Sequence, residues 1–163
     1  MAFSNLKKPA FTLIELLVVM TIIGVLAGLI VPNYMLARQR TRDAQRKSDL
    51  EQIQKALELY KMDQDPPAYP ASLVLNGDDG HCGKCLSTSG PADNDSCPGD
   101  EEVYMKEIPC DPQNNNPYIY TYQRNAGDTL KYTLTACLEN KSDPDGKSGV
   151  GDCPNLGIEK TEP

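Results

Sequence analysis

The chain has 163 residues, with 16 Lys and Arg against 23 Asp and Glu, and a formal net charge of -7 at pH 7. This length allows one small domain plus a terminal segment. The charge is uneven, because residues 1–62 carry nine basic against five acidic side chains and residues 63–163 carry seven against eighteen. Phosphate contacts require Lys and Arg, so the acidic distal part argues against nucleic-acid binding there.

An apolar segment, residues 11–31, follows the basic pair Lys7 and Lys8. Its polar residues are Thr12, Glu15 and Thr21. As an α-helix rising ~1.5 Å per residue, this segment would match a hydrocarbon core of roughly 30 Å, which predicts a membrane helix. Since a carboxylate is costly in lipid, Glu15 is expected to have a function.

The stretch KKPAFTLIELLVVMTIIGVLAGLIVP, residues 7–32, resembles the type III signal of type IV pilins and of the pseudopilins of type II secretion. In that family a peptidase removes the leader and methylates the new terminal amine. The resemblance implies a cut between Ala10 and Phe11. The processing residues it implies are Lys7, Lys8, Ala10 and Phe11, and the assembly residues are Phe11, Glu15 and Pro32. Family members usually have Gly where this chain has Ala10.

The chemistry of Glu15 agrees with an assembly role. After cleavage, the Phe11 amine would be a cation in lipid, and a carboxylate one helical turn away or on a neighbouring subunit could neutralise it. Three other interpretations fit the apolar segment less well. A secretory signal peptide would have a shorter apolar run and a small-residue cut after it. A plain signal anchor would not need Glu15, and a soluble core helix is rarely apolar on every side.

The helical pattern continues beyond residue 31. We interpret Pro32 as a bend, because proline kinks a helix without necessarily ending it. Leu50, Ile53, Leu57 and Tyr60 then recur at spacings of three and four, which predicts one buried face. The sequence Asp65-Pro66-Pro67 predicts a helix end near residues 62–64, which makes one helix of about fifty residues, roughly 75 Å long.

The distal part predicts loops and a small sheet. Residues 66–102 are dense in Pro, Gly, Asp and Ser, which indicates a loop. Residues 118–122 and 130–136 alternate in polarity around a turn at 125–128, which predicts a β-hairpin covering the buried face of the helix. The Pro109-Cys110-Asp111-Pro112 motif resembles the entry to the small sheet of pseudopilins.

Six cysteines lie distal to the apolar segment, and their even number suits disulfides in an oxidising compartment. They are Cys82, Cys85, Cys97, Cys110, Cys137 and Cys153. Six cysteines allow fifteen pairings. We predict one pair, Cys137 with Cys153, which would pin the C-terminal segment to the sheet as distal loops are pinned in many pilins. Two alternatives stay open: a zinc site built from Cys82, Cys85, Cys97 and Cys110, and redox chemistry at Cys82-x-x-Cys85.

Residues 140–152 form an acidic loop with candidate calcium ligands. Asp143, Asp145 and Asp152 match three acidic positions of an EF-hand loop, but Lys141 occupies the first position, where an acid is required. The loop is therefore not an EF-hand. Calcium is a candidate cofactor here, because several pseudopilins carry calcium in a distal loop, but a solvated acidic turn is the default interpretation.

The sequence predicts an α+β protein, with a long N-terminal helix, membrane-spanning in its first half, packed on a small antiparallel sheet head with long disulfide-bonded loops. Four segments are expected: a leader at 1–10, a transmembrane and filament-core helix at 11–32, an amphipathic continuation at 33–64, and a periplasmic or extracellular head at 65–163. The expected role is structural and not enzymatic, as a pilin or pseudopilin subunit of a type IV pilus-like or type II secretion filament. The alternative, from a different class of protein, is a membrane-tethered metal- or redox-active domain that uses the pair Cys82 and Cys85.

The resemblance also implies partners and a location. The partners are copies of the chain and minor pilins in a helical filament, prepilin peptidase, the inner-membrane assembly platform and the lipid bilayer. Nucleic acid is not expected to bind the head. Before assembly the precursor would cross the cytoplasmic membrane once, and afterwards it would lie in a periplasmic or cell-surface filament.

Overall fold

A computed structural model describes residues 11–76, 80–92, 97, 99 and 101–162, apart from the side chains of residues 30–32. The expected leader, with Lys7, Lys8 and Ala10, lies outside the described residues, as does the side chain of Pro32. The chain divides into two compact units, Met1–Arg38 and Gln39–Pro163.

Helix α1, Leu13–Asp63, has 51 residues and belongs to both units. It continues through residue 32, so the proline does not end it. It ends at Asp63, as predicted, before two prolines that cannot donate a backbone hydrogen bond to a further turn. Of the described helices, it is the one long and apolar enough to cross a membrane.

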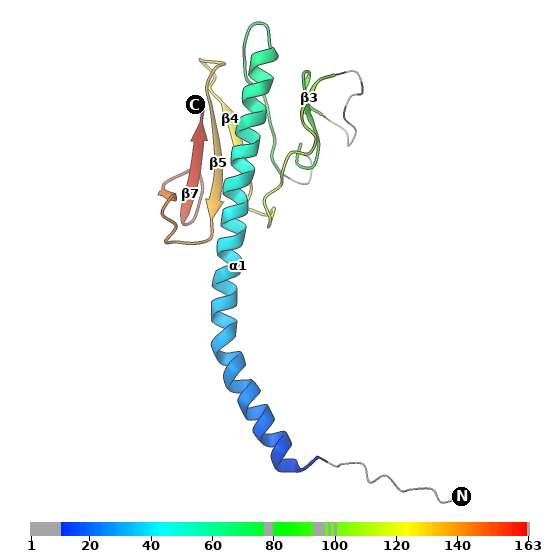
Figure 1. The fold of residues 1–163 in the computed structure, drawn as a ribbon. Helices are drawn as coiled ribbons and strands as arrows, with labels where there is room; N and C mark the ends of the chain where they lie inside the picture. Colours follow the sequence, from blue (N-terminus) through cyan, green and yellow to red (C-terminus); the bar gives the residue numbers. More distant parts are fainter. Residues whose placement is uncertain (1–10, 77–79, 93–96, 98, 100, 163) are drawn as a thin grey trace, which may run out of the picture. The chain divides into compact units, whose positions relative to one another are not determined.

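The second unit adds two antiparallel sheets to the end of α1. Strands β1 (Leu86–Ser87), β2 (Gly90–Pro91) and β3 (Val103–Met105) form the first sheet in the order β2-β1-β3. Strands β4 (Thr121–Arg124), β5 (Tyr132–Leu138), β6 (Lys147–Ser148) and β7 (Leu156–Thr161) form the second in the order β4-β5-β7-β6. Figure 1 shows β4, β5 and β7 along one side of the second half of α1, with β3 on its other side.

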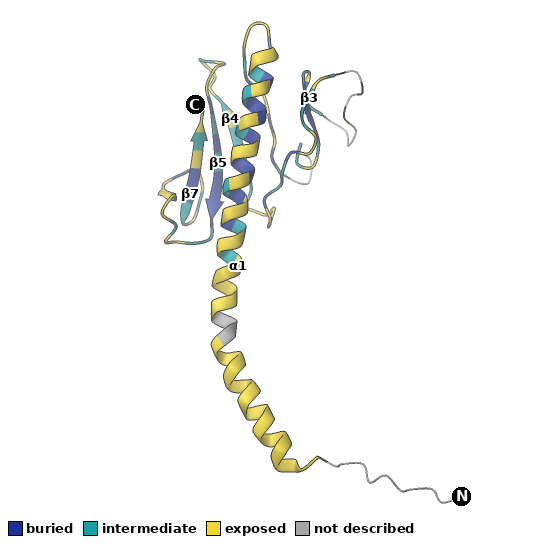
Figure 2. Ribbon diagram, in the orientation of Figure 1, coloured by how far each residue is buried: buried dark blue, intermediate teal, exposed yellow. Residues whose placement is uncertain are grey.

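The hydrophobic core lies between α1 and the sheets. The predicted helical stripe is confirmed, because Leu50, Ile53, Leu57 and Tyr60 are all buried. They share one cluster with sheet residues such as Leu134. Figure 2 shows that buried positions of α1 are confined to its second half. Aromatic side chains widen this core, and the rings of Tyr69 and Tyr132 pack edge to face at 4.6 Å.

The predicted hairpin is present with shifted boundaries. Strand β4 begins at Thr121, not at residue 118, and pairs with β5 from Thr121↔Thr135 to Arg124↔Tyr132. The reason is the preceding turn, where Asn115 and Tyr118 form an isolated bridge around Pro117, which has no N–H to give to a ladder.

Two expectations about strands were incomplete. The segment 66–102, predicted as loop, contains the short strands β1 and β2. Strand β7 was also not predicted, and it pairs along β5 from Thr133↔Thr161 to Leu138↔Leu156. The sequence of β7 has a low strand propensity, because it contains Gly157 and the charged pair Glu159 and Lys160. Its pairing with β5 outweighs this low propensity.

Candidate functional site

The N-terminus of α1 carries a hydrogen-bonded cap built from Thr12 and Glu15. The Thr12 backbone N–H and hydroxyl both donate to Glu15 Oε2, at 2.9 and 2.8 Å, and the Glu15 N–H donates to Thr12 Oγ1 at 3.3 Å. This is the reciprocal capping box that a Thr-x-x-Glu spacing allows, and that spacing is a local signal for the cap in the sequence. Glu15 therefore organises the first turn of the helix.

The apolar side chains of the first unit are exposed to solvent over several turns. Phe11 is 86% exposed and Leu13 83%, and the exposed series continues to Leu29. Water cannot sustain so large an apolar surface on a helix, so lipid or other helices must cover it. This surface, residues 11–29, is called the apolar helix surface below.

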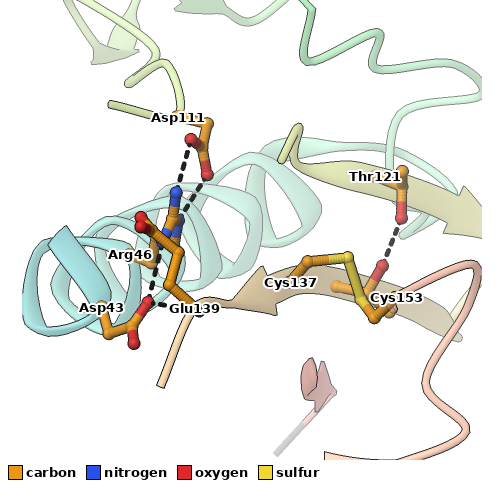
Figure 3. The surroundings of a disulfide bond; sticks show 8 residues. Asp43, Arg46, Asp111, Thr121, Cys137, Glu139 and Cys153 are labelled. Atoms are coloured by element: carbon orange, nitrogen blue, oxygen red, sulfur yellow. Dashed lines mark hydrogen bonds and ion pairs between the residues drawn. A yellow bond between two sulfur atoms is a disulfide. The ribbon is translucent and has the colours of Figure 1, made fainter. Parts of the chain in front are cut away.

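The second unit contains a buried arginine surrounded by three acids, which we call the Arg46 cluster (Figure 3). The Arg46 side chain is 0% exposed. Its guanidinium donates to Asp111 at 2.7 and 3.0 Å, to Asp43 at 2.7 Å and to Glu139 at 2.8 Å. The ring of Tyr118 packs over it at 4.9 Å. A fully buried guanidinium is tolerated because its donors have charged acceptors.

The Arg46 cluster joins three parts of the fold. Asp43 Oδ1 and Oδ2 accept the backbone N–H groups of Glu139 and Asn140, at 3.0 and 2.8 Å, which ties α1 to the end of β5. Asp111 Oδ1 accepts the Gln113 N–H at 2.8 Å, which holds the loop after the Pro-Asp-Pro motif. Helix, loop and sheet thus meet at one ionic centre.

The electrostatics of the cluster favour its charged form. A hydrogen bond from Arg42 lowers the pKa of Glu139. Burial works in the opposite direction, but a further hydrogen bond from Arg46 adds to the first, and the pKa falls from 4.5 to about 2. Burial opposes ionisation of Arg46, but hydrogen bonds to Asp111 and Glu139 outweigh it and raise the Arg46 pKa. Arg46 and Glu139 are therefore both charged at neutral pH. The Arg46 cluster was not predicted from the sequence, although Asp43 and Arg46 at i,i+3 were a signal for one of its pairs.

The acidic loop meets a lysine from α1. Lys47 Nζ lies 2.6 Å from Asp143 Oδ1 and 2.7 Å from Asp145 Oδ2. The bond from Lys47 lowers the pKa of Asp145, and the two carboxylates raise the pKa of Lys47 against its partial burial. Two of the three candidate calcium ligands therefore face an ammonium group.

The third candidate ligand, Asp152, is exposed. Across the described part of the chain, no group of three or more His, Cys, Asp or Glu side chains is placed to hold a metal ion. Calcium binding by Asp143, Asp145 and Asp152 stays a prediction.

The cysteines are used unequally. Cys137 on β5 is bonded to Cys153, which precedes β7, with an S–S distance of 2.04 Å and a Cα–Cα distance of 5.2 Å, and this is the predicted pair. Cys82 is bonded to Cys110. Cys85 is a buried thiol and Cys97 an exposed one. Because the sulfur of Cys82 is bonded to Cys110, the redox interpretation of Cys82-x-x-Cys85 is not favoured.

A helix with a capped, exposed apolar first half that leads into a small antiparallel head defines the class of pilins and pseudopilins. The family model for the prokaryotic N-terminal methylation motif matches residues 6–31. That match covers the basic residues before the helix and the apolar helix surface. The chain is thus a filament-subunit protein of this class, whose members are structural proteins.

Curated relatives specify the family. Type II secretion system core protein G of Pseudomonas aeruginosa is 32% identical over 146 residues, covering 90% of each chain. The protein of that name from Escherichia coli is 32% identical over 161 residues, covering 94% of each, and that from Aeromonas hydrophila is 34% identical over 112 residues, covering 69% of this chain and 71% of the relative. The chain belongs to the type II secretion system core protein G family. No solved structure gave a significant match.

Proposed function

We propose that the chain is a pseudopilin that is inserted in the cytoplasmic membrane as a precursor, trimmed, and packed into a type II secretion filament. The observation that carries this proposal is the 32% identity with a core protein G over 90% of both chains. The apolar helix surface supports it, because packing helix against helix in a filament would cover what lipid covers in the precursor.

Processing is assigned to the segment that precedes α1. Prepilin peptidase would recognise Lys7 and Lys8 and cut between Ala10 and Phe11, which releases the leader 1–10 and makes the Phe11 amine the new terminus. Small Ala10 leaves room at the bond to be cut. The methylation motif match over residues 6–31 supports this assignment.

Assembly is assigned to Phe11 and Glu15. In the described chain, Glu15 uses Oε2 for both bonds from Thr12, which holds the carboxylate beside the first turn. The Phe11 amine lies one turn away in sequence, so Oε1 is the oxygen that we assign to it, in the same subunit or the next. Pro32 would let the helices bend as they pack.

The partners follow from the same assignment. They are copies of the chain and minor pseudopilins in the filament, prepilin peptidase, the assembly platform in the inner membrane, and the bilayer before extraction. The acidic head, with seven basic and eighteen acidic residues over 63–163, stands on the filament surface and is not assigned to nucleic acid.

Deletion of the gene and complementation test this function. Loss should leave secretion substrates inside the envelope, and the unchanged chain should restore their release. Glu15→Ala should insert in the membrane normally and fail to restore release, whereas Glu159→Ala, which removes an exposed carboxylate from β7, should restore it. Normal secretion in the deletion strain, together with sheared surface filaments containing this chain, would favour a pilus subunit instead.

A further inference from the structure

Two cysteines remain outside the disulfides of the second unit. Cys85 lies directly before β1, and Cys97 lies in the connection between β2 and β3. Both fall inside the segment that the Cys82–Cys110 bond encloses. Cys85 is 2% exposed, whereas Cys97 is exposed.

The pairing of the first sheet brings the two thiols together. Strand β1 pairs with β3 through Leu86↔Met105, and the Ile108 N–H donates to the Lys84 carbonyl at 2.7 Å, so residues 106–107 lie opposite Cys85. The Cys97 sulfur lies 3.9 Å from the carbonyl oxygen of Lys106. Cys97 therefore folds back over the part of the sheet where Cys85 is buried.

The ionisation of Cys85 agrees with this contact. Burial is the largest of the effects that raise the pKa of Cys85 to about 11, and a hydrogen bond with the Cys97 thiol is the next. Cys85 is therefore a poor first nucleophile, because its thiolate is scarce at neutral pH. Exposed Cys97 is the sulfur that an external reagent reaches first.

We propose that Cys85 and Cys97 form a third disulfide, nested inside the Cys82–Cys110 bond. The oxidant is the disulfide of an exported thiol–disulfide exchange protein. The Cys97 thiolate attacks one sulfur of that disulfide and forms a mixed disulfide, and Cys85 then loses its proton and displaces the oxidant's sulfur. Two protons and two electrons leave the cysteine pair, and the oxidant becomes a dithiol.

This bond would constrain the part of the head that carries the first sheet. It would close the β1–β2 hairpin and the connection to β3, where the strands are only two or three residues long. In a head whose core is this small, crosslinks replace hydrophobic burial as a source of order.

Peptide mapping tests the proposal. The full chain, made with its leader and extracted from membranes, is alkylated in denaturant without reductant and digested with trypsin. The Lys and Arg positions put Cys85 and Cys97 together in peptide 85–106, with Cys82 in 62–84 and Cys110 in 107–124. We expect peptide 85–106 unalkylated and lighter than its reduced form by the mass of two hydrogen atoms. Alkylation of Cys85 or Cys97, retention of zinc by their thiols, or a crosslink from 85–106 to another peptide would overturn the proposal.

Two variants add a second measurement. Cys97→Ser should let an unspecific protease cut the β2–β3 connection several-fold faster, because the nested bond is lost. Gly99→Ser is the matched control, since it changes the same connection at a position with open space around it and keeps both sulfurs. Equal cutting rates for Cys97→Ser and the unchanged chain would show that no bond holds this connection.

Discussion

At the level of single residues, Arg46 is the buried side chain that connects three parts of the head. Its guanidinium is fully buried and forms ion pairs with an acid of α1, with Asp111 in a loop, and with Glu139 at the end of β5. Charges buried in this way are costly to leave unpaired, although an apolar replacement of the whole set need not destabilise. The arrangement therefore stabilises the head only when complete.

Replacing Arg46 alone should unfold the head more easily. Arg46→Met keeps much of the side-chain volume but leaves Asp43, Asp111 and Glu139 without their shared cation, and we expect a loss of about 3–5 kcal/mol in the free energy of unfolding. Denaturant titration in detergent, followed by the circular dichroism of the tyrosines, measures it. The control Arg40→Met removes an exposed cation six residues earlier and should change stability by less than about 0.5 kcal/mol.

Acid should weaken the head through Glu139. Its pKa is about 2 in the folded chain against 4.5 for the free side chain, so the folded state binds its proton less tightly. The resulting stability, about 3 kcal/mol, is complete above about pH 4.5 and is lost as the pH falls towards 2. Burial raises the pKa of Asp49, which works in the opposite direction, so the test is the difference between the unchanged chain and Glu139→Gln. That difference should shrink between pH 5 and pH 2, and a constant difference would contradict the assignment.

At the level of elements, α1 changes its environment along its length. Its first turns expose Phe11, Leu13 and Ile14, and its last turns bury Leu57 and Tyr60. Between them, Arg46 and Lys47 point to acids of the head. One end of this helix therefore has the apolar surface that packs in a filament or membrane, and the other end packs in the head. Its basic residues lie near the start of the second unit.

The acidic loop should depend on Lys47 for its order. Lys47→Met removes the cation that holds Asp143 and Asp145, so the loop loses both of its ion pairs with α1. Hydrogen exchange at the Gly146 amide, which donates to the Asp143 carbonyl at 3.2 Å, should become faster. The control is Lys55→Met, an exposed position of the same helix. Unchanged exchange in Lys47→Met would show that the loop is ordered without this lysine.

Calcium titration of the same variant separates two accounts of the loop. If the carboxylates bind calcium, removing the competing ammonium should raise the affinity, because a hard cation prefers clustered oxygens free of other cations. Heat measured on adding calcium to Lys47→Met and to the unchanged chain makes the comparison. If neither chain binds calcium, the carboxylates of the loop act only as ion-pair partners of Lys47.

What the sequence allowed us to predict depended on the range of the interaction. The apolar helix surface, the stripe at Leu50 and Leu57, and the hairpin follow local periodicity and were predicted. Strand β7 and the Arg46–Asp111 pair were not, because each depends on a partner far along the chain. The cap formed by Thr12 and Glu15 is local and could have been predicted, since Thr-x-x-Glu is its signature.

At the scale of the whole molecule, the two units have opposite requirements. The first must be kept out of water, and the second carries a strongly acidic surface that keeps it in water. The second unit has a small core and adds two disulfide bonds to it, so its stability depends on conditions oxidising enough to keep those bonds.

Loss of the Cys137–Cys153 bond should destabilise the head. The bond closes a separation of 16 residues, which corresponds to about 3 kcal/mol in the chain-entropy model. Cys137→Ala/Cys153→Ser should show that loss in denaturant titration, with the strand pairing of β5 and β7 retained in the far-ultraviolet circular dichroism. A loss below about 0.5 kcal/mol would show that the β5–β7 ladder alone holds the C-terminal segment.

The last prediction concerns the step that commits the whole chain to assembly. Ala10→Leu should block the peptidase by placing a bulky side chain at the bond before Phe11, and it should leave a precursor about ten residues heavier that stays in the membrane. Ala10→Gly should be processed at least as well as the unchanged chain. Immunoblots of membrane fractions separate precursor from mature protein, and mass spectrometry of the mature form should find a methylated Phe11.

Because the head is distant in sequence from residue 10, Ala10→Leu should keep the Cys137–Cys153 bond and normal protease resistance. A folded head on an unprocessed chain, with secretion lost, would show that folding and assembly are separate steps. Equal processing of all three chains would show that the cut lies elsewhere.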